Sequence, residues 1–169
     1  MIASKRRESI VELLLREKAP IKGVDLAIKF NVTRQIIVKD VAILRAKGSN
    51  IIATPDGYMF NDDNGSRVRS IIAVNHDKDD MIKELEIVIK YGGIIEDVIV
   101  EHPIYGEIKG LLMIKNLNDL NRFKKSFDLS ESTPLSSLTN GVHLHTISVD
   151  TKENMEFIKK ELKENGLIL

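Results

Sequence analysis

A short polar run, NDDNGS at residues 61–66, separates two stretches with different hydrophobic periodicity. Before it, apolar residues recur mainly at helical spacing, and after it strand-like apolar segments alternate with helical ones. A run of Asn, Asp, Gly and Ser is typical of a turn or linker. The sequence therefore predicts two domains, residues 1–63 and residues 64–169.

The two stretches also differ in charge. Residues 1–50 carry eleven Lys and Arg against five Asp and Glu, whereas residues 51–169 carry fourteen against twenty. A basic segment in a protein of zero formal net charge favours a polyanionic partner for that segment, with chance clustering as the alternative. The absence of cysteine excludes disulfides and a thiol nucleophile. Because the sequence has neither a long apolar run nor a secretory signal, we expect a cytoplasmic protein that binds no membrane.

Residues 1–60 have the pattern of a winged helix-turn-helix. Helical spacing of apolar residues predicts helices over residues 4–18, with Ser4 as the N-cap, and over residues 22–29 and 33–47. A hairpin is predicted over residues 51–60, because two short apolar runs flank the turn sequence TPDG. Three helices and a hairpin correspond to the core and wing of a DNA-binding domain, with a three-helix protein-interaction module as the alternative.

The third predicted helix has the residues of a recognition helix. Thr33 is suited to cap it, and polar residues near its start lie opposite its apolar stripe. Arg and Gln side chains form bidentate hydrogen bonds with guanine and adenine edges, whereas Lys and Arg also contact phosphates. The residues predicted to contact DNA are Thr33, Arg34, Gln35, Val38 and Lys39, together with Arg6 and Arg7 of the first helix.

Residues 64–169 have the element order of a small α+β domain. Strands are predicted over residues 70–75, 94–101, 107–114 and 142–149, and helices over residues 79–91, 117–127 and 152–165. The order βαββαβ, with a final helix, is typical of a split-βαβ (ferredoxin-like) sheet with helices on one face. The predicted fold class is therefore α+β, a winged helix-turn-helix followed by this domain.

All four histidines lie in the second domain. His143 and His145 are two residues apart on a predicted strand, so they share one face, and His76 ends another strand in phase with its apolar residues. Burying imidazoles without partners is costly, and a shared metal ion removes that cost. With Glu84, chosen over Glu86 by its spacing, they predict a site for one zinc, nickel, iron or manganese ion. Hydrogen-bonded core histidines are the alternative.

Two polar loops contain candidate effector-binding residues. His102 precedes a proline and lies with Tyr105 in the turn between two predicted strands, where the pair either lines a pocket or only shapes the turn. Ser137 and Thr139 lie in the loop before His143, where their hydroxyls either meet a small carboxylate or face water.

The two domains resemble known protein families. Residues 25–48 are similar to the winged helix at the head of biotin-repressor-type regulators. Residues 70–149 resemble the three-histidine (3H) domain that bacterial repressors join to such a winged helix. The motifs that carry this second resemblance are His76, EL at 84–85, YGG at 91–93, DV at 97–98, EHPIYGEI at 101–108 and PLSSLTNGVHLHTI at 134–147.

This resemblance implies a repressor of genes for NAD biosynthesis and niacin uptake, with nicotinic acid as co-repressor, and not an enzyme. It also implies that the metal ligands of the sensing domain are His76, Glu84, His143 and His145. We expect a homodimer that binds double-stranded operator DNA. The alternatives are a metalloregulator, in which the metal ion is the signal, and a metal-dependent hydrolase with a DNA-binding head, which has less support.

Overall fold

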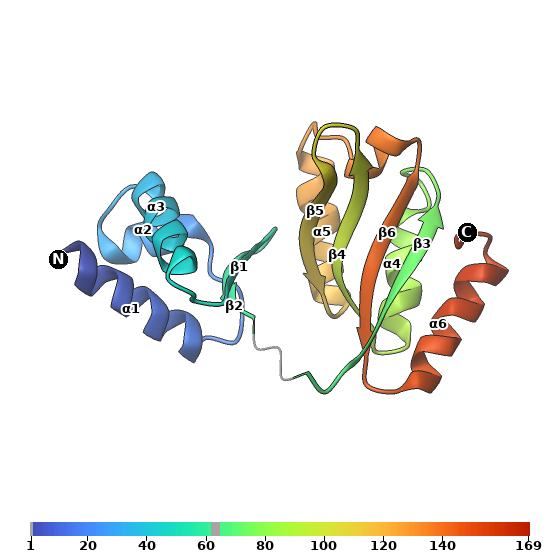
Figure 1. Cartoon of the computed structure of the whole chain (residues 1–169), viewed down its shortest axis with the longest axis horizontal. Coiled ribbons are helices and arrows are strands. Elements are labelled where there is room, and N and C mark those ends of the chain that lie inside the picture. Colours follow the sequence, from blue (N-terminus) through green and yellow to red (C-terminus); the bar gives the residue numbers. More distant parts are fainter. Residues whose placement is uncertain (1, 62–64) are drawn as a thin grey trace. The chain divides into compact units, whose positions relative to one another are not determined.

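The computed structural model describes residues 2–61 and 65–169 (Figure 1). The chain divides into two compact units, Met1–Asp63 and Asn64–Leu169. The predicted domain boundary, between residues 63 and 64, lies outside the described residues. Among the helices that the structure describes, none combines the length and the hydropathy needed to cross a membrane.

The N-terminal unit has the predicted three helices and hairpin. Its first helix starts after Ile2 without a side-chain cap, so the predicted cap Ser4 lies inside the helix. The apolar faces of the three helices meet in a core that includes Ile10, Leu14 and Leu26. The elements are α1 (Ala3–Arg16), α2 (Gly23–Phe30), α3 (Arg34–Ala46), β1 (Ile51–Thr54) and β2 (Gly57–Phe60).

Specific residues fix the connections in this unit. Asn31 ends α2 in the left-handed conformation, and Thr33 caps α3 by accepting a hydrogen bond from a backbone N–H three residues on. Gly57 opens β2 with a φ of 131°, and a Cβ atom there would lie 2.3 Å from the carbonyl oxygen of Ile21. Glycine at this position therefore allows Ile21 to pair with Tyr58 beside the wing.

The C-terminal unit is a four-stranded antiparallel sheet with its helices packed on one face. Figure 1 shows α4 and α5 behind the sheet, and α6 contributes Ile158 and Leu162 to the same apolar core. The elements follow the predicted order: β3 (Val68–Asn75), α4 (Met81–Lys90), β4 (Ile94–His102), β5 (Gly106–Ile114), α5 (Leu117–Leu129), the 3₁₀ helix η1 (Leu135–Thr139), β6 (Val142–Val149) and α6 (Lys152–Glu164).

The strand order of this sheet is β3-β6-β4-β5. Both βαβ crossovers are split, because β6 lies between β3 and β4, and β4 lies between β6 and β5. The α+β class and the split βαβ units are therefore confirmed. The order differs from that of a ferredoxin-like sheet, in which the first and third strands are central, because here the second and fourth are. The predicted element order is the same for both sheets, so it does not determine which strands are central.

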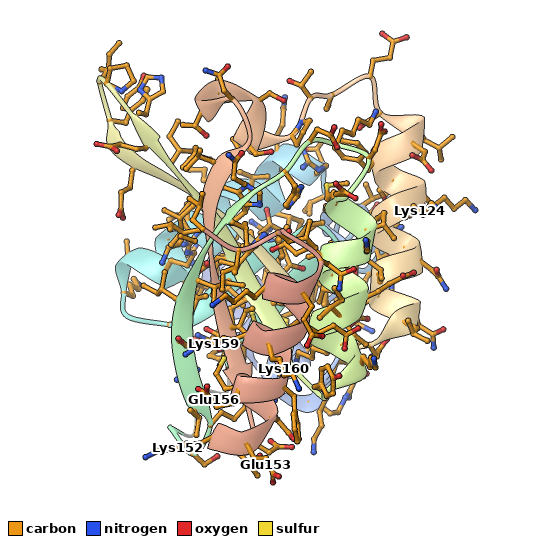
Figure 2. All side chains as sticks on the ribbon, turned by 90° about the vertical axis from the view of Figure 1, so that its right-hand side faces the viewer. Lys124, Lys152, Glu153, Glu156, Lys159 and Lys160 are labelled. Atoms are coloured by element: carbon orange, nitrogen blue, oxygen red, sulfur yellow. The ribbon has the colours of Figure 1, made fainter. Side chains whose placement is uncertain are left out.

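The outer faces of α5 and α6 carry charged side chains. Figure 2 shows Lys124 on α5 directed away from the body of the unit. Lys160 on α6 is 73% exposed. Lys160 lies 3.9 Å from Glu164 in an exposed ion pair. Exposed ion pairs of this kind contribute little to the free energy of folding. We therefore describe these faces as ordinary solvated surface.

Candidate functional site

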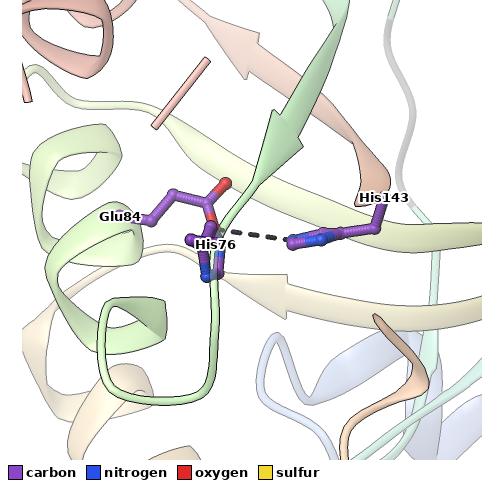
Figure 3. Close-up of side chains that lie close together, drawn as sticks. All are labelled: His76, Glu84 and His143. Atoms are coloured by element: carbon purple, nitrogen blue, oxygen red, sulfur yellow. Dashed lines mark hydrogen bonds and ion pairs between the residues drawn. The ribbon is translucent and has the colours of Figure 1, made fainter. Parts of the chain in front are cut away.

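Three histidines and Glu84 form a buried cluster in the C-terminal unit. Figure 3 shows three of the four residues, His76, Glu84 and His143. Nε2 of His76 lies 2.5 Å from a Glu84 carboxylate oxygen, and Nε2 of His145 and Nε2 of His143 lie 3.3 Å and 3.7 Å from one. None of the four side chains is more than 5% exposed. The ligand atoms of His76, Glu84 and His143 all lie within 4.8 Å of one another, so these three could hold one ion, and His145 contacts Glu84 beside them.

The register of β3 and β6 explains how the histidines meet. Val74 pairs with His143 and Ile72 pairs with His145, so both histidines share the helix-covered face with buried apolar residues. His76 follows the last residue of β3 and contacts His143 edge to face, with ring centroids 4.7 Å apart. The two-residue period places His143 and His145 on one face, and the antiparallel register of β3 and β6 brings His76 to the same end of the sheet.

Glu84 enters the cluster from α4. Glu84 and Val88 are one turn apart on the buried face of this helix, whereas Glu86 is exposed. The helical period thus places Glu84, and not Glu86, over the histidines.

The outer ring nitrogens determine which nitrogen of each histidine is a ligand. Each Nδ1 faces a backbone carbonyl oxygen, and a carbonyl oxygen only accepts hydrogen bonds, so each Nδ1 carries the proton. In a neutral ring the lone pair is then on Nε2, the atom that faces Glu84. The Nδ1–O distances are 2.7 Å from His76 to Asp77, 2.8 Å from His143 to Gly141 and 2.5 Å from His145 to Asp97.

Lone pairs that converge on a carboxylate repel it unless positive charge lies between them. Oε1 of Glu84 is buried and has no hydrogen-bond partner among the described residues. Either ring protons or a metal ion can supply the charge. Three imidazole nitrogens and a carboxylate oxygen suit zinc and related ions, and histidine ligands usually donate their other N–H to a carbonyl or carboxylate. The residues therefore fit a metal ion.

The four groups are electrostatically coupled. Burial raises the pKa of Glu84, but when the rings are protonated the charge of His145 and the hydrogen bonds that the rings donate outweigh it and hold this pKa well below its usual value. Burial lowers the pKa of His145 and of His76, but their interactions with Glu84 and with backbone carbonyls leave both raised. A metal ion bound here would have to displace these protons, so its affinity would fall as the pH falls through the raised values.

A pocket of about 350 Å³ opens beside the cluster. The sequence pointed to Ser137, which lines it, but not to Lys78, whose ammonium lies 4.9 Å from the centre of the Phe127 ring. Thr139 instead directs its hydroxyl at backbone carbonyls. The polar lining residues are Asn75, His76, Asp77, Lys78, Ser136, Ser137 and Asn140. The carboxylate of Asp77 accepts the backbone N–H groups of Asp79 and Asp80.

The structure does not bring His102 and Tyr105 to this pocket. They lie at the β4–β5 turn, with Tyr105 73% exposed and the two rings 5.0 Å apart. Nδ1 of His102 accepts the backbone N–H groups of Ile104 and Tyr105. These contacts are those of a turn and support the alternative that the pair shapes it, so effector binding by His102 and Tyr105 stays a prediction.

The predicted DNA contacts on α3 lie on an accessible face. Arg34, Gln35, Val38 and Lys39 are exposed at the N-terminal half of this helix, and its apolar stripe is buried. Such a face is what major-groove binding requires.

Arg6 has a different role from the one predicted. Its Nε donates a hydrogen bond of 2.6 Å to Asp40, and Arg7 donates one of 3.1 Å to the same carboxylate. The Asp40 side chain is 3% exposed and that of Arg6 is 11% exposed. The prediction of a phosphate contact is corrected for Arg6, because its guanidinium is occupied in compensating a buried charge.

Two families match this chain. Residues 6–59 match an HTH domain, and residues 69–169 match the 3H domain. The chain belongs to the 3H-domain family. It is 42% identical over 168 residues to the probable transcription repressor NiaR of Thermotoga maritima, and this match covers 99% of this chain and 95% of that protein. It is 32% identical over 172 residues to the transcription repressor NadR of Bacillus subtilis, covering 100% and 96%. Both relatives of this 3H-domain chain are named as repressors and not as enzymes.

Proposed function

We propose that this 3H-domain protein represses genes of NAD metabolism by binding operator DNA through its winged helix-turn-helix. In this proposal the C-terminal unit senses nicotinic acid at a metal site. The full-length similarity to NiaR and NadR supports the repressor role. The convergence of three histidine Nε2 atoms on the buried Glu84 carboxylate carries the sensor role.

The proposed metal ligands are His76, Glu84, His143 and His145, and the ion is one divalent transition metal per chain. A bound cation supplies a Lewis acid and a concentrated positive charge at the edge of the pocket. Lys78 supplies a second positive charge there. Asp77 also lines the pocket, but one of its carboxylate oxygens accepts two backbone N–H groups. With the ion bound, positive charge exceeds negative charge at this pocket, and we infer that its ligand is a small carboxylate.

Nicotinic acid, the co-repressor that the family resemblance implies, has this chemistry. Its carboxylate can accept hydrogen bonds from Lys78 and from the hydroxyl of Ser137. Asn140 offers both a donor and an acceptor on the same pocket wall. A pocket of about 350 Å³ is large enough for a single aromatic ring.

A homodimer is part of this proposal. Helix-turn-helix repressors bind two half-sites roughly 34–36 Å apart with two recognition helices. A two-fold dimer holds α3 and its copy at such a fixed spacing, and the effector then has to bind the DNA-competent arrangement better than the other.

Nicotinate is expected to tighten operator binding by about 5–150-fold when the protein carries metal. The measurement is a fluorescence anisotropy titration of the full chain against a duplex selected from a random DNA pool. Lys78→Ala should lose most of the nicotinate effect, because the carboxylate loses its cation. Lys83→Ala, an exposed lysine of α4, is the matched control and should keep it.

Two outcomes of this titration contradict the effector role. If nicotinate leaves the operator affinity unchanged at every metal loading tested, the effector claim fails. If metal alone changes the affinity and nicotinate adds nothing, the protein is a metalloregulator.

Arg34→Ala is expected to weaken operator binding by about 1–3 kcal/mol and to relax base preference at one position. Lys39→Ala should weaken binding to all sequences alike and reduce the salt dependence, since phosphate contacts carry no sequence information. Competition assays with single-base operator variants distinguish the two effects. Arg16→Ala, whose side chain is 70% exposed on α1, is the control. Equal loss in all three variants would argue against α3 as the recognition helix.

A further inference from the structure

The hydrogen bond that orients His145 differs from those of the other two histidines. For His76 and His143, the carbonyl that accepts from Nδ1 belongs to a residue at most two positions away in the chain. For His145 it belongs to Asp97 of β4, 48 residues away. Only the orientation of His145 therefore depends on how accurately another strand is held.

Asp97 lies where β4 and β6 change register. Ile95 pairs with Ile147 and Ile99 pairs with Leu144, so three residues of β4 lie opposite two of β6. An extra residue in one strand forms a β-bulge, which interrupts the ladder of backbone hydrogen bonds and re-aims the backbone groups beside it.

The Asp97 side chain makes a hydrogen bond across this irregularity. Its Oδ1 accepts the backbone N–H of Thr146 at 2.8 Å, and its side chain is only 5% exposed. Asp97 thus contacts two successive residues of β6, with its carbonyl on the ring of His145 and its carboxylate on the N–H of Thr146. Lys109, 49% exposed, lies 3.4 Å from the other carboxylate oxygen.

We propose that Asp97 is a positioning residue of the metal site. Its carboxylate holds the β4 bulge against β6, and this aims the Asp97 carbonyl at Nδ1 of His145. The bond keeps the proton on Nδ1 and so leaves the Nε2 lone pair directed into the cluster. The inference rests on the proposed metal-binding function.

Co²⁺ binding to the full chain tests this role. Affinity is measured by competition with a chelator, and ligand geometry by the visible absorption of the Co²⁺-saturated protein. Asp97→Ala is expected to lower the affinity by about 10–100-fold, as outer-shell substitutions do, and to change the spectrum. Asp97→Asn keeps an oxygen that can accept from Thr146, so its affinity and spectrum should match those of the unaltered chain.

Glu96→Ala is the matched control, because Glu96 is the neighbour of Asp97 and bonds to Arg69 at the surface. It should leave the affinity and spectrum unchanged. Metal-free circular dichroism spectra check that each variant is folded. If Asp97→Ala does not fold, the comparison of Asp97→Asn with the unaltered chain still decides, since a large loss of affinity in Asp97→Asn contradicts the proposal.

The proposal is overturned if Asp97→Ala binds Co²⁺ as tightly as Glu96→Ala and with the same spectrum. It is also overturned if Asp97→Asn loses as much Co²⁺ affinity as Asp97→Ala. The negative charge of Asp97, and not the oxygen that accepts from Thr146, would then be what matters. Failure of the unaltered chain to bind Co²⁺ would reject the metal site as well. Tight binding in the unaltered chain, with loss in Glu84→Gln but not in Asp97→Ala, would reject the Asp97 inference alone.

Discussion

Glu84→Gln is expected to lower the affinity for a divalent metal ion by more than the roughly 10–100-fold that is typical of an outer-shell substitution. The reason is the position of this carboxylate, which is 0% exposed and faces Nε2 of all three histidines. A neutral amide does not supply the charge that balances a divalent cation in a buried site. Competition with a chromophoric chelator at neutral pH measures the change.

Glu86→Gln is the matched control for this prediction. Glu86 lies on the same helix, two residues later, and on its exposed face. The substitution removes the same charge from α4 and should leave metal affinity unchanged. Equal metal affinity in the two variants would show that the ion, if bound, is not held at the histidine cluster.

Asp40→Ala is expected to destabilise the N-terminal unit by about 3–5 kcal/mol, the cost of removing one partner from a buried ion pair. Arg6 is held against Asp40 at 2.6 Å and is mostly buried, so the substitution leaves its guanidinium without a counter-charge. Urea denaturation followed by circular dichroism measures the loss. Asp25→Ala, at an exposed position of α2, should unfold at the same urea concentration as the unaltered chain.

The two kinds of N-terminal variant separate folding from DNA contact. Asp40→Ala is expected to weaken operator binding through the lower stability of the unit, whereas Arg34→Ala should weaken it with unchanged stability. If Asp40→Ala is as stable as Asp25→Ala, the ion pair with Arg6 does not support the fold, and Arg6 returns as a candidate phosphate contact.

Local periodicity accounts for most of what the sequence predicted correctly. The expected strand over residues 142–149 coincides with β6. The helix expected over residues 117–127 starts at the predicted residue and ends slightly later, at Leu129. The same periodicities placed His143 and His145 on the buried face. Because each of these properties depends on neighbours in the chain, they can be predicted from one sequence.

Properties that depend on contacts between distant segments were not predicted. The strand order of the sheet is one, because several orders bury the same apolar faces. The pairing of Arg6 with Asp40, 34 residues apart, is another, since it requires α1 to pack against α3. The bond from His145 to Asp97 arises at a bulge that no periodicity in the sequence marks.

The metal coordination itself can be measured by X-ray absorption spectroscopy on the zinc-loaded full chain. The account predicts scattering from three imidazole rings and one carboxylate oxygen, with nearest ligands at about 2.0–2.2 Å. The imidazole signal should weaken by one ring in His145→Ala. An all-oxygen shell without imidazole scattering, or a spectrum unchanged by His145→Ala, would contradict a metal ion bound among His76, Glu84, His143 and His145.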